Sequence, residues 1–220
     1  MRNLLFIFPV LLIFSCSHHE NEKEKRSLST VNMPEKEVNA AKKSATGKIF
    51  QVDTAYIRWT AYKTTKKIPV SGTFKEVEWQ NWHPASSPQA LAERLYFKIR
   101  TNSVHTDNPE RDKTIYEYLF GKLLEGNYIE GRVAEAGAGK IRVVLRFNGL
   151  EKPLDFLYSV NDTLLHAVAY FDLIKDFQAG EALYFLHTAC KDKHTGPDGI
   201  SKTWPDVKVE AFIRYHEKDE

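Results

Sequence analysis

The sequence predicts a mostly antiparallel β-sheet domain, arranged as a barrel or a sandwich, with two short helices. Three observations lead to this class. Many short segments alternate apolar with polar residues, an Asn148-Gly149 turn joins two of them, and two segments have helical spacing. Alternation with a period of two is typical of strands that bury one face and leave the other in water. Numerous short strands with few helices favour a closed or double-layered sheet.

Residues 1–15 have the pattern of a secretory signal peptide. Arg2 precedes an apolar run from Leu4 to Phe14, which is shorter than the about 20 apolar residues that cross a bilayer as a helix. The ending LIFSC resembles a bacterial lipoprotein cleavage box. This resemblance implies that Cys16 is acylated and becomes the first residue of the mature protein. The alternative is an ordinary secretory signal that is followed by a chance cysteine.

Residues 16–47 form a charged segment almost without aromatic residues. Such a composition buries too little apolar surface to offset the entropy cost of ordering, so we expect a flexible tether. Residues 48–220 have the size of one domain. If Cys16 carries lipid, Cys190 is the one remaining thiol and no internal disulfide forms. The domain then depends on a packed core for its stability.

The charge distribution argues against one class of partner. The formal net charge is +2, and acidic and basic residues are interspersed along the chain. A protein that binds nucleic acid usually carries a basic stripe or patch. We therefore expect no nucleic-acid partner.

Two segments early in the domain show the strand pattern clearly. The first is YIRWTAYK at residues 56–63, and the second is RLYFKIRT at residues 94–101. Their apolar faces carry Ile57, Trp59, Ala61, Leu95, Phe97 and Ile99. The intervening residues are polar or amphipathic, so each strand is expected to have a single buried side.

The clearest hairpin spans residues 140–160. Asn148-Gly149 joins its strands, and this dipeptide is typical of two-residue turns with positive φ angles. The face expected to be buried carries Ile141, Val143, Leu145, Phe147, Leu154, Phe156, Tyr158 and Val160. Residues 162–173 and 206–215 supply two further strands.

Two segments are expected to be helical. In residues 107–123, Asn108 is placed to cap the helix, Pro109 suits its first turn, and apolar side chains recur every four residues from Ile115. The second helix covers residues 179–196. Gly196 stands at its end, where glycine is typical of a left-handed cap.

The second helix raises the question of a metal or thiol site. His187, Cys190 and His194 stand at i, i+3 and i+7, and imidazole and thiolate are ligands for zinc or copper. The same helix, however, has an apolar stripe of Leu183, Leu186 and Cys190, which favours core packing of the thiol. The dipole favours a positive charge on His194 in the last turn. Metal binding and a redox-sensing thiol stay open as alternatives to packing.

Catalytic motifs are missing from the sequence. AEAGAGKI resembles a phosphate loop weakly, but Ile141 follows Lys140 where Ser or Thr is required, so a hairpin turn is the better interpretation. No nucleophile elbow, zinc-protease helix or dinucleotide fingerprint occurs. We therefore expect a binding protein and not an enzyme.

Five stretches between about Phe50 and Ile213 form a recognisable set: IRWTAYK, VSGTF, NSVHTDNPERDKTIYEYLF, ACKDKHTG and TWPDVKVEAF. Together they resemble the YceI-like family of secreted lipid-binding proteins. The most specific piece is Arg111-Asp112, soon after NSVHT. The resemblance implies a lipocalin-like antiparallel eight-stranded β-barrel with an apolar tunnel for a polyisoprenoid chain, such as a polyprenyl lipid or a quinone tail. For Arg111 and Asp112 it implies a structural role, such as an ion pair that fixes the helix over the barrel mouth, with direct ligand contact as the alternative.

The side chains expected to line the tunnel are aromatic or aliphatic residues on the inward faces. They are Trp59, Phe74, Phe97, Ile99, Phe120, Leu145 and Phe156. A barrel of eight strands has room inside for side chains alone or for one small ligand. A dry core would give the same alternation as an open tunnel.

The functional prediction is an envelope lipoprotein that binds, stores or ferries a polyisoprenoid-type lipid, with no other cofactor. A buried alkyl carbon gains roughly 0.8 kcal/mol relative to water, but a lipid in a bilayer is already out of water, so its transfer is nearly neutral and suits a carrier. We expect lipid anchoring at the outer membrane of a bacterial cell envelope. The alternatives are a metal- or thiol-dependent stress-defence protein centred on His187, Cys190 and His194, and a purely structural barrel.

Overall fold

The computed structural model of the chain describes residues 47–218. The signal peptide at residues 1–15, the lipidation of Cys16 and nearly all of the tether expected in residues 16–47 lie outside this range. Within the described range, no helix combines the length and the apolar character needed to cross a membrane.

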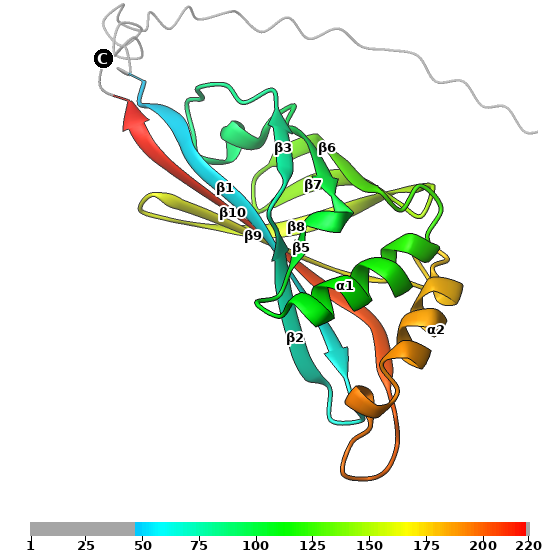
Figure 1. Ribbon diagram of the computed structural model, residues 1–220. Coiled ribbons are helices and arrows are strands. Elements are labelled where there is room, and N and C mark those ends of the chain that lie inside the picture. Colours follow the sequence, from blue (N-terminus) through cyan, green and yellow to red (C-terminus); the bar gives the residue numbers. More distant parts are fainter. Residues whose placement is uncertain (1–46, 219–220) are drawn as a thin grey trace, which may run out of the picture. The chain divides into compact units, whose positions relative to one another are not determined.

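The described chain is one curled antiparallel sheet with two helices, which confirms the predicted class (Figure 1). The strands are β1 (Ile49–Lys63), β2 (Ile68–Phe74), β3 (Val77–Gln80), β4 (Tyr96–Arg100), β5 (Val104–His105), β6 (Tyr128–Gly137), β7 (Lys140–Phe147), β8 (Leu150–Asn161), β9 (Leu164–Asp172) and β10 (Thr203–Lys218). The helices are α1 (Pro109–Tyr118) and α2 (Gly180–Ala189), and 3₁₀ turns occur at η1 (Gln89–Ala92), η2 (Thr101–Ser103), η3 (Phe120–Lys122) and η4 (Asp192–His194).

The sheet has ten strands where eight were predicted, because two of its chain segments are bent. Only Lys75 and Glu76 separate β2 from β3, and η2 alone separates β4 from β5. The two bent segments pair with each other on both sides of the bend, β3 with β4 and β2 with β5. The ten strands therefore belong to eight chain segments. Their pairing runs from β4 through β6, β7, β8, β9, β10 and β1 to β2, which leads back into β3.

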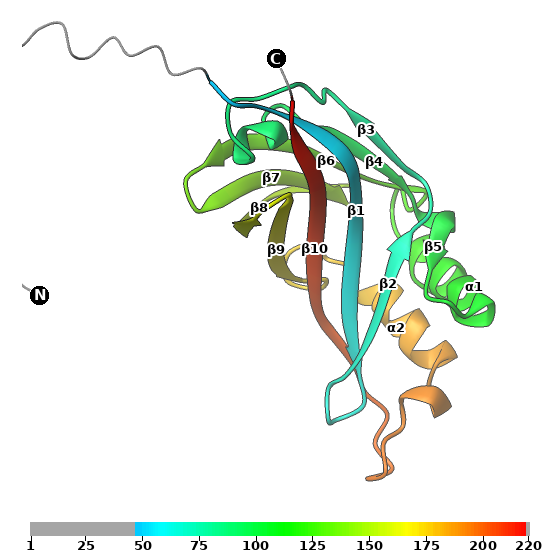
Figure 2. The ribbon, with the colours of Figure 1, turned by 90° about the vertical axis from the view of Figure 1, so that its left-hand side faces the viewer.

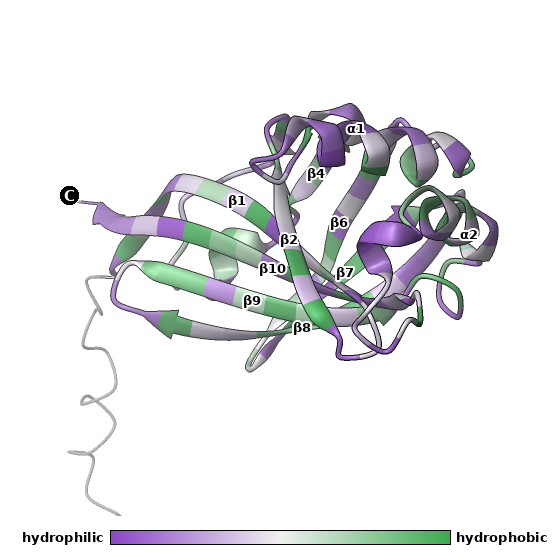
Figure 3. Cartoon of the chain, turned by 60° about the horizontal axis from the view of Figure 1, so that its bottom comes forward, coloured by the Kyte–Doolittle hydropathy of each residue, from purple (hydrophilic) through white to green (hydrophobic). Residues whose placement is uncertain are grey.

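Local sequence signals account for several of these boundaries. Asn148 and Gly149 have φ angles of 51° and 70°, as the predicted two-residue turn between β7 and β8 requires. The Asn148 side chain also donates to the Phe177 carbonyl at 2.8 Å and accepts from the Leu124 N–H at 2.9 Å, which ties two neighbouring loops to the turn. Alternating hydropathy along the strands can be followed in Figure 3.

Helix α1 begins as predicted and ends earlier. The N–H of Arg111 donates to the Asn108 side chain at 2.9 Å, and Pro109 occupies the first helical position. The α-helix ends at Tyr118 and continues as η3, so the residue at 123 that was expected in the helix lies outside it. Ile115 is buried, as the four-residue spacing predicted.

The prediction for the second helix is wrong at its C-terminus. Helix α2 ends at Ala189, and the chain then tightens into η4, where the His194 N–H donates to the Cys190 carbonyl at 2.9 Å. Thr195 and Ser201 pair as a β-bridge, so the chain reverses here instead of continuing as a helix. The left-handed glycine is Gly199, with a φ of 74°, and not Gly196.

The two ends of the curled sheet differ. At one end, the segment between β3 and β4 folds across the opening, with Leu91 and Ala92 of η1 almost completely buried. A pair of backbone hydrogen bonds between Phe50 and Ala85 fixes this segment to β1. Helices α1 and α2 lie at the opposite end, beside the hairpin of β1 and β2 (Figures 1 and 2).

Candidate functional site

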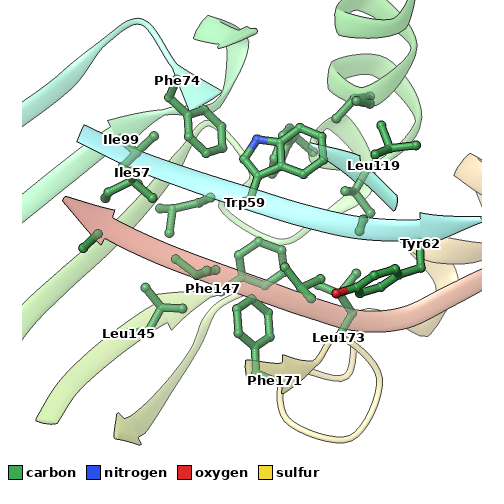
Figure 4. Close-up of a pocket in the computed structure, with 18 of the residues that line it drawn as sticks. Ile57, Trp59, Tyr62, Phe74, Ile99, Leu119, Leu145, Phe147, Phe171 and Leu173 are labelled. Atoms are coloured by element: carbon green, nitrogen blue, oxygen red, sulfur yellow. The ribbon is translucent and has the colours of Figure 1, made fainter. Parts of the chain in front are cut away.

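The concave side of the sheet encloses a cavity of about 500 Å³. Its wall is formed by every strand except β5 and by both helices, and it is apolar along most of its length. Figure 4 shows side chains such as Trp59, Phe74, Phe147 and Phe171 that extend from different strands toward one shared space. The volume falls in the range of ligand pockets, roughly 300–1,000 Å³. The interior is therefore a cavity and not the dry core that the alternation equally allowed.

All the side chains expected to line a tunnel do line this cavity. They are Trp59, Phe74, Phe97, Ile99, Phe120, Leu145 and Phe156. Phe97, Ile99, Phe120, Leu145 and Phe156 are buried, and Trp59 and Phe74 are half-buried because they face the open space. The structure thus brings the residues together, and their contact with a lipid stays a prediction.

Sequence reasoning missed other wall residues. Phe171 and Leu165 lie on the inward face of β9. The alternation of apolar and polar residues in 162–173 could have predicted both positions. Trp79 comes from β3, a strand of four residues that is too short to give a clear pattern. Phe171 and Phe147 both contact Phe177. The ring centroid of Phe177 lies 5.3 Å from that of Phe171 and 5.4 Å from that of Phe147.

Two glycines explain how large aromatic side chains leave the cavity open. Gly72 on β2 pairs with Trp59 on β1, and a Cβ at Gly72 would lie 2.4 Å from the indole ring. Gly131 on β6 pairs with Phe97 on β4, and a Cβ there would lie 2.1 Å from the phenyl ring. Each ring therefore covers the glycine backbone of the neighbouring strand. The rings form part of the wall and do not fill the space.

Small side chains contribute the rest of the free volume. Ala167 on β9 and Ala211 on β10 are cross-strand partners, and both line the cavity. Ala61 on β1 also lines it. Larger residues at these positions would occupy the space that the curled sheet encloses.

One end of the cavity is polar. The inward face of β1 carries Ile57, Trp59 and Ala61 and then ends at Lys63, which pairs with Thr203 at the start of β10. The other polar residues of the wall are Tyr62, Asn108, Arg111, Thr114, Lys193, His194, Thr203 and Trp204. Together these residues form what we call the polar mouth. None of the described residues that line the cavity is an aspartate or a glutamate.

The predicted histidine and cysteine cluster lies beside this mouth but is not arranged as a metal site. The Nδ1 atoms of His187 and His194 both lie within hydrogen-bond distance of the Thr203 hydroxyl, at 3.0 and 2.6 Å. Both imidazoles therefore have a protein partner. Within residues 47–218, no three His, Cys, Asp or Glu side chains are grouped so that they could hold a metal ion. The metal-centred alternative has no support in this geometry.

The electrostatics of the cluster also differ from expectation. Burial, helped by Lys63 and His187, lowers the pKa of His194 to about 4, so the ring is neutral and does not carry the charge expected from the helix dipole. Burial raises the pKa of the Cys190 thiol, against the opposing effect of Lys193 and Lys63. A buried, protonated thiol is a poor nucleophile. Cys190 packs against the cavity, as the apolar stripe predicted.

Arg111 and Asp112 take separate roles: within the described residues no salt bridge joins them, and Asp112 Oδ2 lies 3.6 Å from His105 Nδ1 at the end of β5. The Oδ1 atom of Asp112 accepts from the N–H and the hydroxyl of Thr106, at 2.8 and 2.6 Å, and ties α1 to the end of β5. Arg111 lines the polar mouth. Within the described chain, its guanidinium takes part in no salt bridge.

Comparison with known proteins agrees with this architecture. No protein-family model and no curated protein matches the chain. Among solved structures, it is similar to a polyisoprenoid-binding domain from Saccharophagus degradans implicated in plant cell wall breakdown. The identity is 14%, the match covers 77% of this chain and 98% of that one, and the TM-score is 0.53. At this identity the likeness establishes a shared fold.

Two further solved structures show weaker similarity. BcnA from Burkholderia cenocepacia matches with 14% identity over 75% of this chain and 99% of that one, at a TM-score of 0.45. The YCEI protein of Campylobacter jejuni matches with 19% identity over 69% of this chain and 86% of that one, at a TM-score of 0.40.

Proposed function

We propose that this chain is a YceI-like protein whose cavity binds the apolar chain of a polyisoprenoid-type lipid, such as a polyprenyl chain or a quinone tail. The observation that carries the proposal is the cavity of about 500 Å³, with a continuous apolar wall and a polar mouth. An elongated apolar chain with a polar end matches this distribution. The shared fold with the polyisoprenoid-binding domain of Saccharophagus degradans supports the lipid class.

The energetics favour a carrier or a store over a tight trap. Burial of a methylene group gains roughly 0.8 kcal/mol relative to water. A lipid that leaves a bilayer exchanges one apolar environment for another, so the net gain on entering the cavity is small. Loading and release are then governed by access through the mouth, and no catalytic step is part of the proposal.

The place of action that we propose follows from the N-terminal sequence. The signal-like residues 1–15 and the cleavage box at Cys16 fit an envelope lipoprotein anchored by lipid, and we assign it to the outer membrane. The charged residues 16–47 would let the domain move over the membrane surface, where it could exchange lipid.

A pair of variants tests the cavity as the lipid site. Ala167→Phe places a ring inside the cavity, whereas Ser159→Phe places the same ring on the exposed face of the neighbouring strand. Both proteins are purified without detergent, checked for native β-sheet by circular dichroism and extracted with organic solvent. Mass spectrometry should find less lipid per protein in Ala167→Phe and an unchanged amount in Ser159→Phe. Equal lipid in both folded variants would exclude the cavity as the site.

If Ala167→Phe does not fold, its cross-strand partner gives a milder test. Ala211→Val adds only two methyl groups to the same wall. A folded Ala211→Val protein should prefer shorter or less branched chains than the parent. An unchanged lipid profile would argue against the proposal.

A further inference from the structure

Two loops that are far apart in the sequence meet at one end of the sheet and concentrate positive charge there. The first joins β1 to β2 at residues 63–68, and the second follows helix α2 at residues 191–202 (Figures 1 and 2). Together these stretches contain six lysines and two aspartates, a formal charge of +4, whereas the whole chain has only +2. The rest of the chain therefore carries a net negative charge.

We infer that the outer surface of these loops docks on a membrane that contains anionic phospholipids. The exposed residues that we assign to the contact, and call the basic tip, are Lys66, Lys67, Ile68, Lys191, Ile200 and Lys202. None of these six described residues lines the cavity. The inference therefore concerns an outer surface, and it stands whether or not the cavity binds a lipid.

Hydrogen bonds hold the two loops together. The N–H of Thr64 donates to the Lys202 carbonyl at 2.8 Å, and the indole N–H of Trp204 donates to the Thr64 carbonyl at 2.7 Å. The Thr65 hydroxyl also donates to the Asp198 carboxylate of the other loop. Because the loops are fixed to each other, the basic tip presents its side chains as one surface.

Most of the positive charge of the basic tip is available to a partner. Within residues 47–218, no salt bridge includes Lys66, Lys191 or Lys202. Lys67 differs, since its ammonium group pairs with the Asp206 carboxylate at 2.9 Å. Three of the four lysines of the tip are therefore free to approach lipid phosphates.

Two exposed isoleucines point to a membrane as the partner. Ile68 is 44% exposed and Ile200 is 55% exposed. An isoleucine side chain gains free energy when it leaves water for the acyl boundary of a bilayer, while lysines in the same surface meet the anionic phosphates. A nucleic acid or another soluble polyanion offers no apolar region to these two side chains. The combination therefore fits an anionic bilayer surface.

Docking at the basic tip is compatible with the proposed function and with the proposed anchor. Lys63 and Lys193 belong to the same two loops and line the cavity, so a docked tip would bring the opening of the cavity close to the bilayer. Residues 17–48 can extend over roughly 100 Å, whereas the 15 residues of β1 span about 50 Å. A chain anchored at Cys16 could therefore still place this end of the domain on the membrane.

Vesicle sedimentation tests the docking. Residues Ala45–Glu220 form a compact unit with its own core, so the assay uses this part of the chain, which lacks the apolar residues 4–14 and Cys16. The protein is mixed with vesicles of phosphatidylcholine alone, or of equal parts phosphatidylcholine and phosphatidylglycerol. It should sediment with the mixed vesicles and stay in solution with the neutral ones. The bound fraction should fall as salt is added, because the lysines are exposed.

Matched pairs of lysine variants assign the contact. Lys66→Gln combined with Lys191→Gln should weaken binding to the mixed vesicles by at least about fivefold, since each lysine near an anionic membrane contributes to binding. Lys75→Gln combined with Lys175→Gln is the control, because it removes two exposed lysines outside the tip. The control pair should bind the mixed vesicles as the parent does.

A second pair of variants separates a membrane from a soluble polyanion. Ile68→Ser combined with Ile200→Ser keeps every lysine and should also weaken binding to the mixed vesicles, because less apolar surface enters the bilayer. Leu157→Ser combined with Val160→Ser replaces exposed apolar residues of β8 and should leave binding unchanged. Circular dichroism checks that all the variants are folded.

The outcomes separate this inference from the proposed function. Equal sedimentation with neutral and mixed vesicles, sedimentation with neither, or an equal loss in the two lysine pairs overturns the docking. Unchanged binding of the isoleucine variant overturns the assignment of a membrane. A parent protein that carries lipid but binds no vesicles keeps the proposed function, whereas one that binds the mixed vesicles but carries no lipid keeps only the docking.

Discussion

Gly72→Ala tests how the aromatic wall is built. An added Cβ would lie 2.4 Å from the Trp59 ring, 2.8 Å from the His105 carbonyl oxygen and 2.8 Å from the Thr106 side chain. The indole could rotate, but the carbonyl belongs to the backbone of β5, which pairs with β2. The substitution therefore requires a movement of the sheet as well as of a side chain.

The expected cost follows from this contact. Overpacking of a well-packed site lowers the free energy of unfolding by about 1–3 kcal/mol. Replacing glycine also restricts the unfolded chain, which raises the free energy of unfolding by about 0.4–1 kcal/mol. The net destabilisation is about 1–2 kcal/mol, which lowers the melting temperature of a domain of this size by roughly 2–8 °C. Displacement of the indole into the cavity should also weaken binding of a hydrophobic dye.

The matched control is Gly137→Ala on β6. A Cβ at Gly137 would meet its nearest neighbour, a Glu135 carboxylate oxygen, at 3.6 Å, and so fits without movement. Thermal unfolding of both lipid-free variants by circular dichroism gives the comparison. If Gly72→Ala melts within about one degree of Gly137→Ala, the ring does not lie over Gly72 and this account of the open cavity is wrong.

Further predictions concern the groups around the mouth. Asp112→Ala should lower the free energy of unfolding by about 1–3 kcal/mol, measured in urea, because the buried Thr106 loses its acceptor. His194 has a pKa lowered from 6.5 to about 4, so the unfolded chain takes up its proton first and stability should fall as the pH drops from about 6.5 toward 4; His194→Gln should reduce this fall. Modification of Cys190 by a thiol reagent, followed by peptide mass spectrometry, should be slow and should slow further when a lipid fills the cavity that the thiol lines.

Each of these predictions has a result that would contradict it. Glu117→Ala removes an exposed carboxylate of the same helix and should cost little, so an equal loss in the Asp112 and Glu117 variants would refute a special role for Asp112. Identical pH profiles for the parent and His194→Gln would show that His194 is not the group that titrates. If Cys190 is modified at the same rate with and without lipid, the lipid does not lie in the cavity that the thiol lines.

Much of the fold could be predicted because its signals are local. The turn at Asn148-Gly149 and the cap at Asn108 depend on a few adjacent residues. Period-two alternation was enough to place Trp59 and Phe97 on the inward face. The alternation stops after Ala61, where the pairing of β1 with β10 shifts register and the consecutive residues Tyr62 and Lys63 both line the cavity, so the sequence did not show where the polar mouth lies.

The open cavity could not be predicted from alternation. It depends on the pairing of Trp59 with Gly72 and of Phe97 with Gly131, and strand register is not visible in a single sequence. The end of α2 was also missed, since helical spacing continues through Cys190 while the Thr195–Ser201 bridge reverses the chain. Long-range pairing decided both features.

Native mass spectrometry of the protein, purified from a bacterial envelope without detergent or chelator, tests the central claim most directly. We expect an adduct in the mass range of a lipid that fragments as a prenyl chain. The adduct should be lost from the variant in which Ala167→Phe fills the cavity. A protein that repeatedly carries no lipid, or that carries a metal ion and nothing else, would contradict the account.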